Sequence, residues 1–425
     1  MSSSLIEEYQ SVKGMSDILP NQIHEWLYVE KILLNLISKY GYKQIRLPLV
    51  EKTALFKRAI GDTTDIVEKE MFTFLDEKSR SLSLRPEGTA GCVRACLEYG
   101  LLRNLPLKLC YLGPMFRYEA PQKGRNRQFH QLGIECFGVD SCDAEVEQIA
   151  IFSRLWKELG IEHCVQLEIN TLGEPQLRKI YIKELINYFE HHYEDLDLDS
   201  KRRLKINPLR ILDTKNPEMF KLLQNAPKLI NYLDEQSLNN YDLFKLHLSK
   251  LGIKYLENFN IVRGLDYYTG IVWEWRSNLL GAQSAVGAGG RYNNLIAQLG
   301  GNQVAAVGLA IGLERLILLL QQQNKKIPIN NPKGYLICVG EEALQQKFIV
   351  AEKIRELCPQ FSFVLDLLGG SFKNQFKRAD KSEADIALVL GENEIANNSI
   401  TIKHLRSSSD QQQFTTKLSE INKFI

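Results

Sequence analysis

The stretch FRYEAPQKGRNRQFHQLGIECFG, residues 116–138, decides the fold of the chain around it. Strand-like apolar runs lie before it, in LKLCYLG (107–113), and at its end, in QLGIECFG (131–138), while Pro121 and Gly124 interrupt its middle. The pattern predicts a strand, a long loop and a second strand. A long loop between paired strands is uncommon unless it has a function.

The loop is rich in charge. Its charged side chains are those of Arg117, Glu119, Lys123, Arg125 and Arg127. Arginine and lysine at this density suit the phosphates of a nucleotide or of RNA, although a solvated hairpin with a charged tip has the same composition.

The returning strand carries a second signal. Gln131 and Glu135 alternate with the apolar Leu132 and Ile134. Because successive strand residues point to opposite faces, the two polar side chains share one face. The alternation predicts a polar pocket on this face of the strand.

The composition bounds the class of protein. The chain has 425 residues, 44% of them apolar and 24% charged, which is typical of a soluble globular protein of two or three domains. The net charge of +2 restricts any nucleic-acid surface to a local patch. The chain has no apolar run of about 18 residues, and MSSSLIEEYQ lacks the features of a secretion signal, so we expect a cytoplasmic protein. Its eight cysteines form no C-x-x-C pair, which favours reduced thiols over a metal site or disulfides.

Apolar periodicity predicts the order of elements. The expected elements are helices over 21–40, 89–100 and 143–159, the last with Asp143 as its N-cap, strands over 42–50, 260–275 and 285–290, a hairpin over 71–89, and alternating strands and helices after a linker at 321–334. Residues 173–257 have a charged, helical pattern without long strand signals, which predicts a helical insertion; His191 and His192 there are expected on a solvated helix face.

Two further segments gather polar groups. RGLDYYTG, residues 263–270, places Arg263, Asp266, Tyr267 and Tyr268 on an expected strand, although a hairpin with stacked tyrosines would use the same residues. Arg315 opens an apolar helix in GLERLILLL, where an arginine that reaches out to water is the alternative. The GAGGRY segment lacks the spacing of a dinucleotide or P-loop fingerprint.

Together these segments resemble the class II aminoacyl-tRNA synthetases, and within them the histidyl-tRNA synthetase family. The helix and strand ending at Pro48 resemble motif 1, residues 116–138 motif 2, and AVGLAIGLERL (306–316) motif 3. RGLDYYTG and AVGAGGRYNNLI resemble the two signatures peculiar to this family. The resemblance covers nearly the whole chain.

The resemblance implies an α+β class II catalytic core, an antiparallel sheet flanked by helices, together with a helical insertion and a C-terminal α/β anticodon-binding domain. The expected divisions are a catalytic core in two parts, 1–172 and 258–325, a helical insertion at 173–257, and an anticodon-binding domain at 326–425. The family activates L-histidine with ATP to histidyl-adenylate and transfers histidine to the 3′ end of tRNA(His). The resemblance further implies that the protein is a homodimer, and that Mg²⁺ is bound mainly through ATP with no other metal.

The resemblance also implies roles for residues around ATP. Arg117 would hold the α-phosphate, Glu119 the adenine edge and Arg315 the γ-phosphate, with Phe129 stacked on adenine. Arg263 would lie between the histidine carboxylate and the α-phosphate. Arg117, Arg263 and Arg315 are therefore the expected catalytic residues, because arginine forks match phosphate oxygens.

The histidine pocket implied by the resemblance has two parts. Glu87, Thr89 and Gln131 would surround the ammonium group. The imidazole would meet Glu135 and Tyr268, with Tyr267 nearby; its one donor and one acceptor can both be satisfied by a carboxylate and a hydroxyl.

Two basic surfaces are expected to meet tRNA. On the motif 2 loop, Lys123, Arg125 and Arg127 would follow the acceptor end. In SFKNQFKRADK the cations Lys373, Lys377, Arg378 and Lys381 would face the anticodon arm, although a plain solvated helix face fits them as well. Ala120 departs from the arginine that many family members carry in the motif 2 loop, which affects how the acceptor end is read.

Two rival functions share the core. A histidyl-tRNA-synthetase-like regulatory subunit of ATP phosphoribosyltransferase would lack the C-terminal domain and active-site arginines, whereas both are present here. A prolyl or threonyl enzyme would lack RGLDYYTG. The sequence therefore favours the histidine enzyme.

Overall fold

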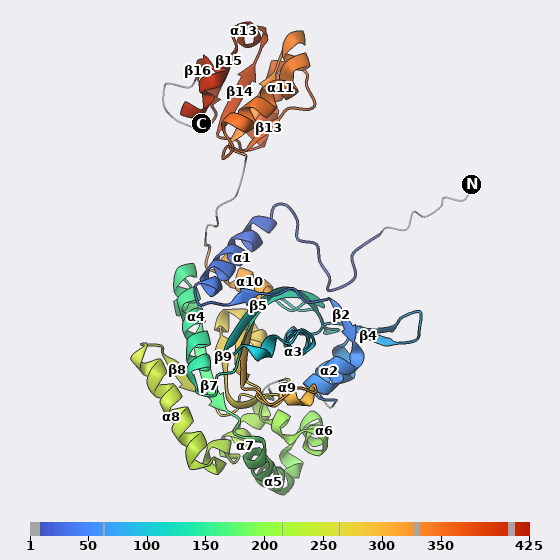
Figure 1. Ribbon diagram of the computed structural model, residues 1–425. Coiled ribbons are helices and arrows are strands. Elements are labelled where there is room, and N and C mark those ends of the chain that lie inside the picture. Colours follow the sequence, from blue (N-terminus) through green and yellow to red (C-terminus); the bar gives the residue numbers. More distant parts are fainter. Residues whose placement is uncertain are drawn as a thin grey trace, which may run out of the picture. The chain divides into compact units, whose positions relative to one another are not determined.

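The computed structural model describes residues 9–62, 64–214, 216–262, 264–325, 327, 332–406 and 413–425. The chain forms two compact units, residues 1–327 and 328–425, called here the first unit and the C-terminal unit. Figure 1 shows the elements of each.

The first unit is built on an eight-stranded sheet with the order β1-β5-β6-β11-β10-β9-β7-β8. The edge pairs β1–β5 and β7–β8 are parallel and the other pairs are antiparallel. The strands are β1 (Lys43–Gln44), β5 (Leu107–Phe116), β6 (Gln128–Phe137), β7 (Gln166–Thr171), β8 (Tyr255–Glu257), β9 (Thr269–Arg276), β10 (Ala285–Arg291) and β11 (Ala306–Gly312). The predicted antiparallel sheet is confirmed, with parallel pairs at its two edges.

The strand–loop–strand predicted around residues 116–138 is the central hairpin of this sheet. Strands β5 and β6 pair along their full length, from Leu107 opposite Phe137 to Phe116 opposite Gln128. Leu132 and Ile134 are fully buried in the apolar core. The alternation on β6 therefore divides the sheet into an apolar face and a polar one.

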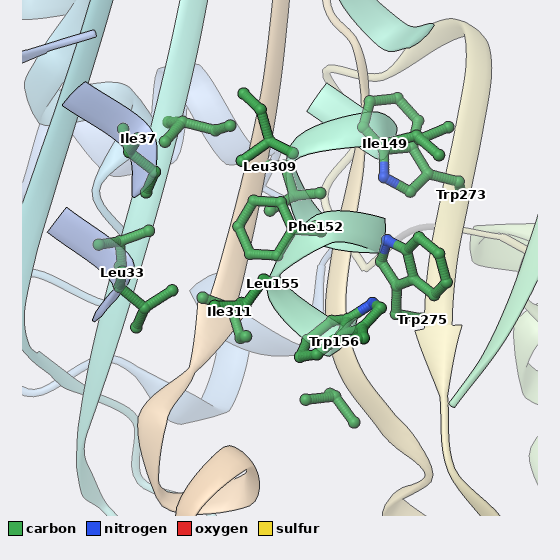
Figure 2. Packing of buried hydrophobic residues seen from close by; sticks show 14 of the residues in the cluster. Leu33, Ile37, Ile149, Phe152, Leu155, Trp156, Trp273, Trp275, Leu309 and Ile311 are labelled. Atoms are coloured by element: carbon green, nitrogen blue, oxygen red, sulfur yellow. The ribbon is translucent and has the colours of Figure 1, made fainter. Parts of the chain in front are cut away.

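Helices cover the apolar face. They are α1 (Ile23–Ser38), α4 (Asp143–Leu159), α8 (Glu235–Lys250) and α10 (Leu313–Gln322), and all four contribute to one buried cluster. Figure 2 shows Leu33 and Ile37 of α1, Phe152 and Trp156 of α4, and Trp273 and Trp275 of β9 packed together with strand β11. Burial of these large apolar side chains is the main stabilisation of the unit.

Shorter elements lie over the opposite face. They include a three-stranded sheet, β2-β4-β3, and helices that contribute to a second buried cluster. These elements are β2 (Val50–Lys52), α2 (Thr53–Ile60), the π-helix η1 (Ile66–Glu70), β3 (Thr73–Leu75), β4 (Ser81–Leu84), α3 (Thr89–Glu98) and α9 (Leu295–Gln298). The hairpin predicted over 71–89 is confirmed as β3 and β4.

The segment expected to be an insertion is helical. It contains α5 (Pro175–His191), α6 (Leu198–Ile206), the 3₁₀ turn η5 (Pro208–Ile211) and α7 (Phe220–Asn225) before α8. Figure 1 shows α5, α6 and α7 grouped on one side of the sheet. Helix α8 packs instead on α4, through Tyr241, Phe244 and Leu248 of the main apolar cluster. The boundaries 173 and 257 stay a prediction.

Three local predictions were wrong. The strand over 42–50 breaks into β1 and β2, because Arg85 donates to the carbonyl of Leu47 between them and Pro48 has no N–H for a ladder. Strand β9 begins only at Thr269, so GLDYY (264–268) lies in a loop rather than in the strand expected over 260–275. Asp143 is the first residue of α4 and Cys142 is its N-cap.

The C-terminal unit has a five-stranded sheet, β13-β12-β14-β15-β16, whose first three strands are parallel. Its elements are β12 (Gly334–Cys338), α11 (Glu341–Leu357), β13 (Phe363–Leu365), α12 (Phe372–Lys381), β14 (Ile386–Leu390), α13 (Glu392–Ala396), β15 (Ser399–His404) and β16 (Gln413–Lys417). The predicted α/β pattern is confirmed. None of the helices in the described part of the chain has the length and apolarity needed to span a bilayer.

Candidate active site

A cavity of about 660 Å³ opens on the polar face of the large sheet. Strands β6, β10 and β11, the N-terminus of α3, and residues of α6 and η5 supply its walls. Ten of the residues expected to bind substrates line it: Glu87, Thr89, Arg117, Glu119, Arg125, Phe129, Gln131, Tyr267, Tyr268 and Arg315. Arg263 lies outside the described residues.

Glu135 lies beneath the cavity rather than in its wall. Its side chain is 1% exposed, and both carboxylate oxygens accept hydrogen bonds from hydroxyls. Oε1 accepts from Thr89 Oγ1 at 2.8 Å and from Tyr111 at 2.9 Å, while Oε2 accepts from Tyr292 at 2.5 Å. Glu135 therefore meets the cavity through the hydroxyls of Thr89 and Tyr111, which do line it.

Burial changes the acidity of this carboxyl group. Removal from water raises the pKa of Glu135 to about 8, and the hydroxyl hydrogen bonds only partly oppose that rise. Burial also raises the pKa of Glu87, against the donors that hold it. Those donors are the backbone N–H groups of Thr89 (2.6 Å) and Ala90 (2.9 Å), so Glu87 anchors the start of α3.

Two glycines make room for the Glu135 network. A Cβ at Gly133 would collide with the ring of Tyr111, its partner across the β5–β6 pair. A Cβ at Gly308 would collide with the carboxylate of Glu135, its partner across the β6–β11 pair. Only glycine fits at these two positions, because each lets a polar side chain lie flat across the sheet.

Three tyrosine rings form one wall of this region. The ring centroids of Tyr267 and Tyr268 are 4.7 Å apart, and Tyr267 lies 5.5 Å edge-on from Tyr292. All three side chains are buried. The paired tyrosines of RGLDYYTG are thus brought against the network of Glu135.

Guanidinium groups also line the cavity. Arg315 donates from Nη1 to the carbonyl of Ala285 at 2.6 Å and from Nε to that of Gly124 at 3.2 Å. Arg117 donates to the carbonyl of Pro86 at 2.9 Å and lies 5.3 Å from the centroid of Phe129. Burial, followed by the charges of Arg125 and Arg117, lowers the pKa of Arg315 to about 10. The guanidinium groups of Arg117, Arg125 and Arg315 therefore lie close enough to repel one another, and the carboxylates of Glu274 and Glu314 line the same cavity.

The motif 2 loop divides its cations between different surroundings. Arg125 faces the cavity and forms an ion pair with the buried carboxylate of Glu119. The guanidinium of Arg127 lies 3.8 Å from the ring centroid of Tyr118. Lys123 lines a second, smaller cavity of about 290 Å³ beside α1 and α10. The three residues expected to follow tRNA therefore lie in three environments.

Helix α12 of the C-terminal unit also separates its cations. Lys373 and Lys377 are exposed. Arg378 instead donates from Nε and Nη2 to the fully buried carboxylate of Asp366, at 2.7 and 2.9 Å, and Asp366 also accepts from Tyr335 at 2.9 Å. Arg378 holds the loop after β13 in place.

Sequence reasoning missed three residues of the site. Tyr111 and Tyr292 bond to Glu135, and Glu274 of β9 lines the cavity near Arg315. Tyr292 lies within the AVGAGGRYNNLI segment, so a signal for it was present. Tyr111 had only an ordinary strand pattern around it.

Comparison with known proteins agrees with this geometry. The profile of histidyl-tRNA synthetase matches residues 14–316, and that of an anticodon-binding domain matches residues 333–425. A histidine–tRNA ligase of Legionella pneumophila (strain Lens) is 49% identical over 422 residues, covering 99% of both chains. That of Hydrogenovibrio crunogenus is 49% identical over 406 residues, 96% of this chain and 95% of the other.

A solved structure is also similar along the whole chain. Apo histidyl-tRNA synthetase of S. aureus superposes with a TM-score of 0.81 at 32% identity, covering 98% of this chain and 99% of the other. With the family profile spanning the first unit and relatives near half identity over their full length, the chain belongs to the histidyl-tRNA synthetase family.

Proposed function

We propose that this protein activates L-histidine with ATP and transfers it to tRNA(His). One observation carries the proposal: a single cavity is lined both by guanidinium groups and by hydroxyls that bond the carboxyl group of Glu135. The test is amino-acid-dependent ATP–pyrophosphate exchange with each of the twenty amino acids, without tRNA. Exchange with histidine alone is expected, and exchange with another amino acid or with none would overturn the proposal.

The ATP site is assigned to the guanidinium groups. Arg117 takes the α-phosphate and Arg315 the γ-phosphate, Phe129 stacks on adenine and Glu119 meets its edge. Burial, and after it repulsion from Arg125 and Arg117, lowers the pKa of Arg315; phosphate oxygens would offset both effects, which favours a triphosphate over a neutral ligand. Fixed guanidinium groups also stabilise the charge that develops during transfer.

The histidine pocket is assigned to Glu87, Thr89, Gln131, Glu135, Tyr267 and Tyr268, with Arg263. The hydroxyls of Thr89 and Tyr111 donate their hydrogen bonds to Glu135, so their oxygens are left with lone pairs that can accept hydrogen bonds from a ligand in the cavity. Lone pairs suit the N–H donors of the ammonium and imidazole groups. When an analogue without these N–H groups binds, the polar groups of the site are left without hydrogen-bond partners. Such a site can therefore discriminate against the analogue by a factor of roughly 10⁴–10⁵ in kcat/KM.

The reaction needs two steps. In the first, a carboxylate oxygen of histidine attacks the α-phosphorus, the bond to the β-phosphate bridging oxygen breaks, and pyrophosphate leaves. In the second, a ribose hydroxyl at the 3′ end of tRNA attacks the carbonyl carbon of the adenylate and AMP leaves. Arg117, Arg263 and Arg315 act in the first step by holding phosphate and carboxylate close together.

The family is ATP-dependent, and we propose Mg²⁺ as its cofactor here. The donors fit a hard cation, because the carboxylates of Glu274 and Glu314 line the cavity near Arg315. Bound with ATP, Mg²⁺ would neutralise phosphate charge. Glu314 is already oriented, since its two oxygens accept from the backbone N–H of His130 at 2.8 and 3.0 Å.

For tRNA we propose two surfaces. Lys123 and Arg127 beside the cavity meet the acceptor end, with Arg125 shared between the loop and the nucleotide. Lys373, Lys377 and Arg378 on α12 meet the anticodon arm, the two lysines by direct contact with phosphate and Arg378 through its hold on the neighbouring loop. We place the protein in the cytoplasm, where its substrates occur.

We also propose a homodimer built on motif 1. Large apolar side chains are exposed there, including Leu27 on α1 (58%) and Leu49 (42%) before β2. Light scattering of the purified protein is expected to give twice the chain mass of 48.7 kDa. A mass of one chain at micromolar concentration would contradict this assembly.

A further inference from the structure

The loop that carries Tyr267 and Tyr268 is held from outside the sheet. It joins residue 264 to the start of β9, and it contacts the helical segment through Arg178 in the first turn of α5. Nη2 of Arg178 donates to the carbonyl of Tyr268 at 2.6 Å. This is the shortest of the hydrogen bonds that Arg178 makes in the described chain.

The same guanidinium binds the junction between β7 and α5. Nε donates to the carbonyl of Leu172 at 3.3 Å and Nη2 to that of Gly173 at 3.5 Å. The junction is itself paired with the start of β9, because Leu172 N–H donates to Gly270 at 2.7 Å and Gly270 N–H to Gly173 at 3.2 Å. One side chain therefore bonds three carbonyls that belong to two segments about 95 residues apart, a task for which the planar fork of arginine is suited and lysine is not.

A second set of contacts holds the loop from the same side. Asp266 accepts from Asn207 at 3.5 Å, and its backbone N–H donates to the carbonyl of Ile60 in the core at 3.1 Å. Arg210 forms an ion pair with Asp65 at 3.1 Å. Burial raises the pKa of Asp266, and the charges of Arg210 and Arg178 only partly oppose that rise. The loop is thus enclosed between the core and the helices α5 to η5.

We infer that Arg178 is a positioning residue for histidine binding, which acts by fixing the backbone of Tyr268 from helix α5. The inference rests on the histidine pocket proposed above. Arg178 does not line the cavity, whereas Tyr268 does, so the effect passes through the tyrosine. It follows that a displacement of α5 would move the backbone of Tyr268 and so change the affinity for histidine.

The test uses the full-length variants Arg178→Met and Arg178→Lys in ATP–pyrophosphate exchange, with Arg80→Met as a control. Arg80 is an exposed guanidinium in the turn between β3 and β4 whose partner is Asp76 at 2.6 Å. We expect the KM for histidine to rise by about tenfold to 100-fold in Arg178→Met. The KM for ATP, and both constants in Arg80→Met, should stay within about twofold of the wild type. The lysine variant should recover part of the loss.

A double-mutant cycle separates positioning from general structural damage. Because Arg178 acts through Tyr268, replacing Arg178 in a Tyr268→Ala background should raise the KM for histidine little further. Additive effects, an equal rise in the KM for ATP, or unchanged constants in a folded variant would each overturn the inference. If Arg178→Met does not fold, the cycle is run with Arg178→Lys, and additivity there decides against it. Wild-type exchange is measured first, so a failure of the proposed function is recognised separately.

Discussion

The hydroxyl of Tyr292 donates to Oε2 of Glu135 at 2.5 Å, across the intervening strand β11. Glu135 lies on β6 and Tyr292 just after β10. Gly308 of β11 lies between them, paired with Glu135 on one side and with Gly290 on the other. A side chain at Gly308 would meet both the carboxylate and the tyrosine ring. The hydrogen bond therefore connects the signature AVGAGGRYNNLI to motif 2, and it can form because Gly308, between them, has no side chain.

Replacement of Tyr292 by phenylalanine should weaken histidine binding. It removes a hydrogen-bond donor from a buried carboxyl group and leaves the acceptor oxygen unsatisfied, which costs about 1–3 kcal/mol. We expect the KM for histidine in pyrophosphate exchange to rise by about tenfold or more, with the KM for ATP unchanged. Tyr335→Phe is the matched control, because Tyr335 donates to Asp366 in the C-terminal unit. An equal change in both variants would contradict the assigned role.

The raised pKa of Glu135 predicts a dependence of stability on pH. The unfolded carboxyl loses its proton near pH 4.3, whereas the folded one keeps it until about pH 8. Between these values the folded state binds more protons, so its stability falls as pH rises, by up to about 1.4 kcal/mol per pH unit for one proton. Glu135→Gln should remove this part of the slope between pH 5 and 8.

Thermal unfolding of the ligand-free wild type and of Glu135→Gln at several pH values measures the difference. Glu87 and Glu145 also have a raised pKa from burial, and they are present in both proteins, so the comparison isolates Glu135. Parallel curves for the two proteins would show that Glu135 is already ionised at neutral pH.

Sequence patterns were most informative where the residues in contact are close along the chain. The alternation on β6 predicted that Gln131 and Glu135 share a polar face, and the hairpin with β5 followed from the turn residues between them. The partners of Glu135 were not predictable in the same way. Tyr111 and Tyr292 reach it through the register of β5, β6, β11 and β10, and register depends on pairings that no local pattern records.

Long-range side chains explain the other misses. Arg85 donates to the carbonyl of Leu47 and so interrupts the segment 42–50, whose composition favours a continuous strand. The cations of the motif 2 loop looked equivalent in sequence, yet Glu119 draws Arg125 into the cavity. Likewise Asp366 draws Arg378 away from the exposed lysines of α12. Charge density predicts a binding surface, but the location of buried carboxylates decides which cations belong to it.

Arg315→Lys should separate the two proposed sites in the cavity. Lysine keeps the charge but loses the fork that bonds Gly124 and Ala285 and can also receive phosphate oxygens. We expect the exchange rate to fall by about 100-fold, as when a donor to developing charge is removed. The KM for histidine should stay within about twofold. If only the KM for histidine rose, the assignment of Arg315 to the ATP site would be contradicted.

The ion pair between Arg291 and Glu145 is expected to be the most sensitive polar contact for stability. Both side chains are buried, and the guanidinium donates to each carboxylate oxygen at 2.7 Å. Arg291→Met would leave a buried carboxylate without its partner, which costs about 3–5 kcal/mol. The midpoint of urea unfolding should fall accordingly and recover in the double variant Arg291→Met, Glu145→Leu. No recovery would assign the loss to Arg291's bonds with the carbonyls of Val139 and Ser141.

The exposed lysines of α12 should affect tRNA and nothing else. Lys373 and Lys377 lie on the solvent side of a helix whose other face is anchored by Arg378, so their removal leaves the fold intact. A lysine on a phosphate weakens binding for all sequences alike and contributes about one unit to the slope of log affinity against log salt concentration. We therefore expect Lys373→Ala with Lys377→Ala to raise the KM for tRNA and to reduce that slope by about two. Histidine-dependent exchange without tRNA should be unchanged. Arg378→Met is the contrasting variant, because it should lower the thermal stability of the C-terminal unit. An unaltered salt slope in the double lysine variant would remove α12 from the tRNA surface.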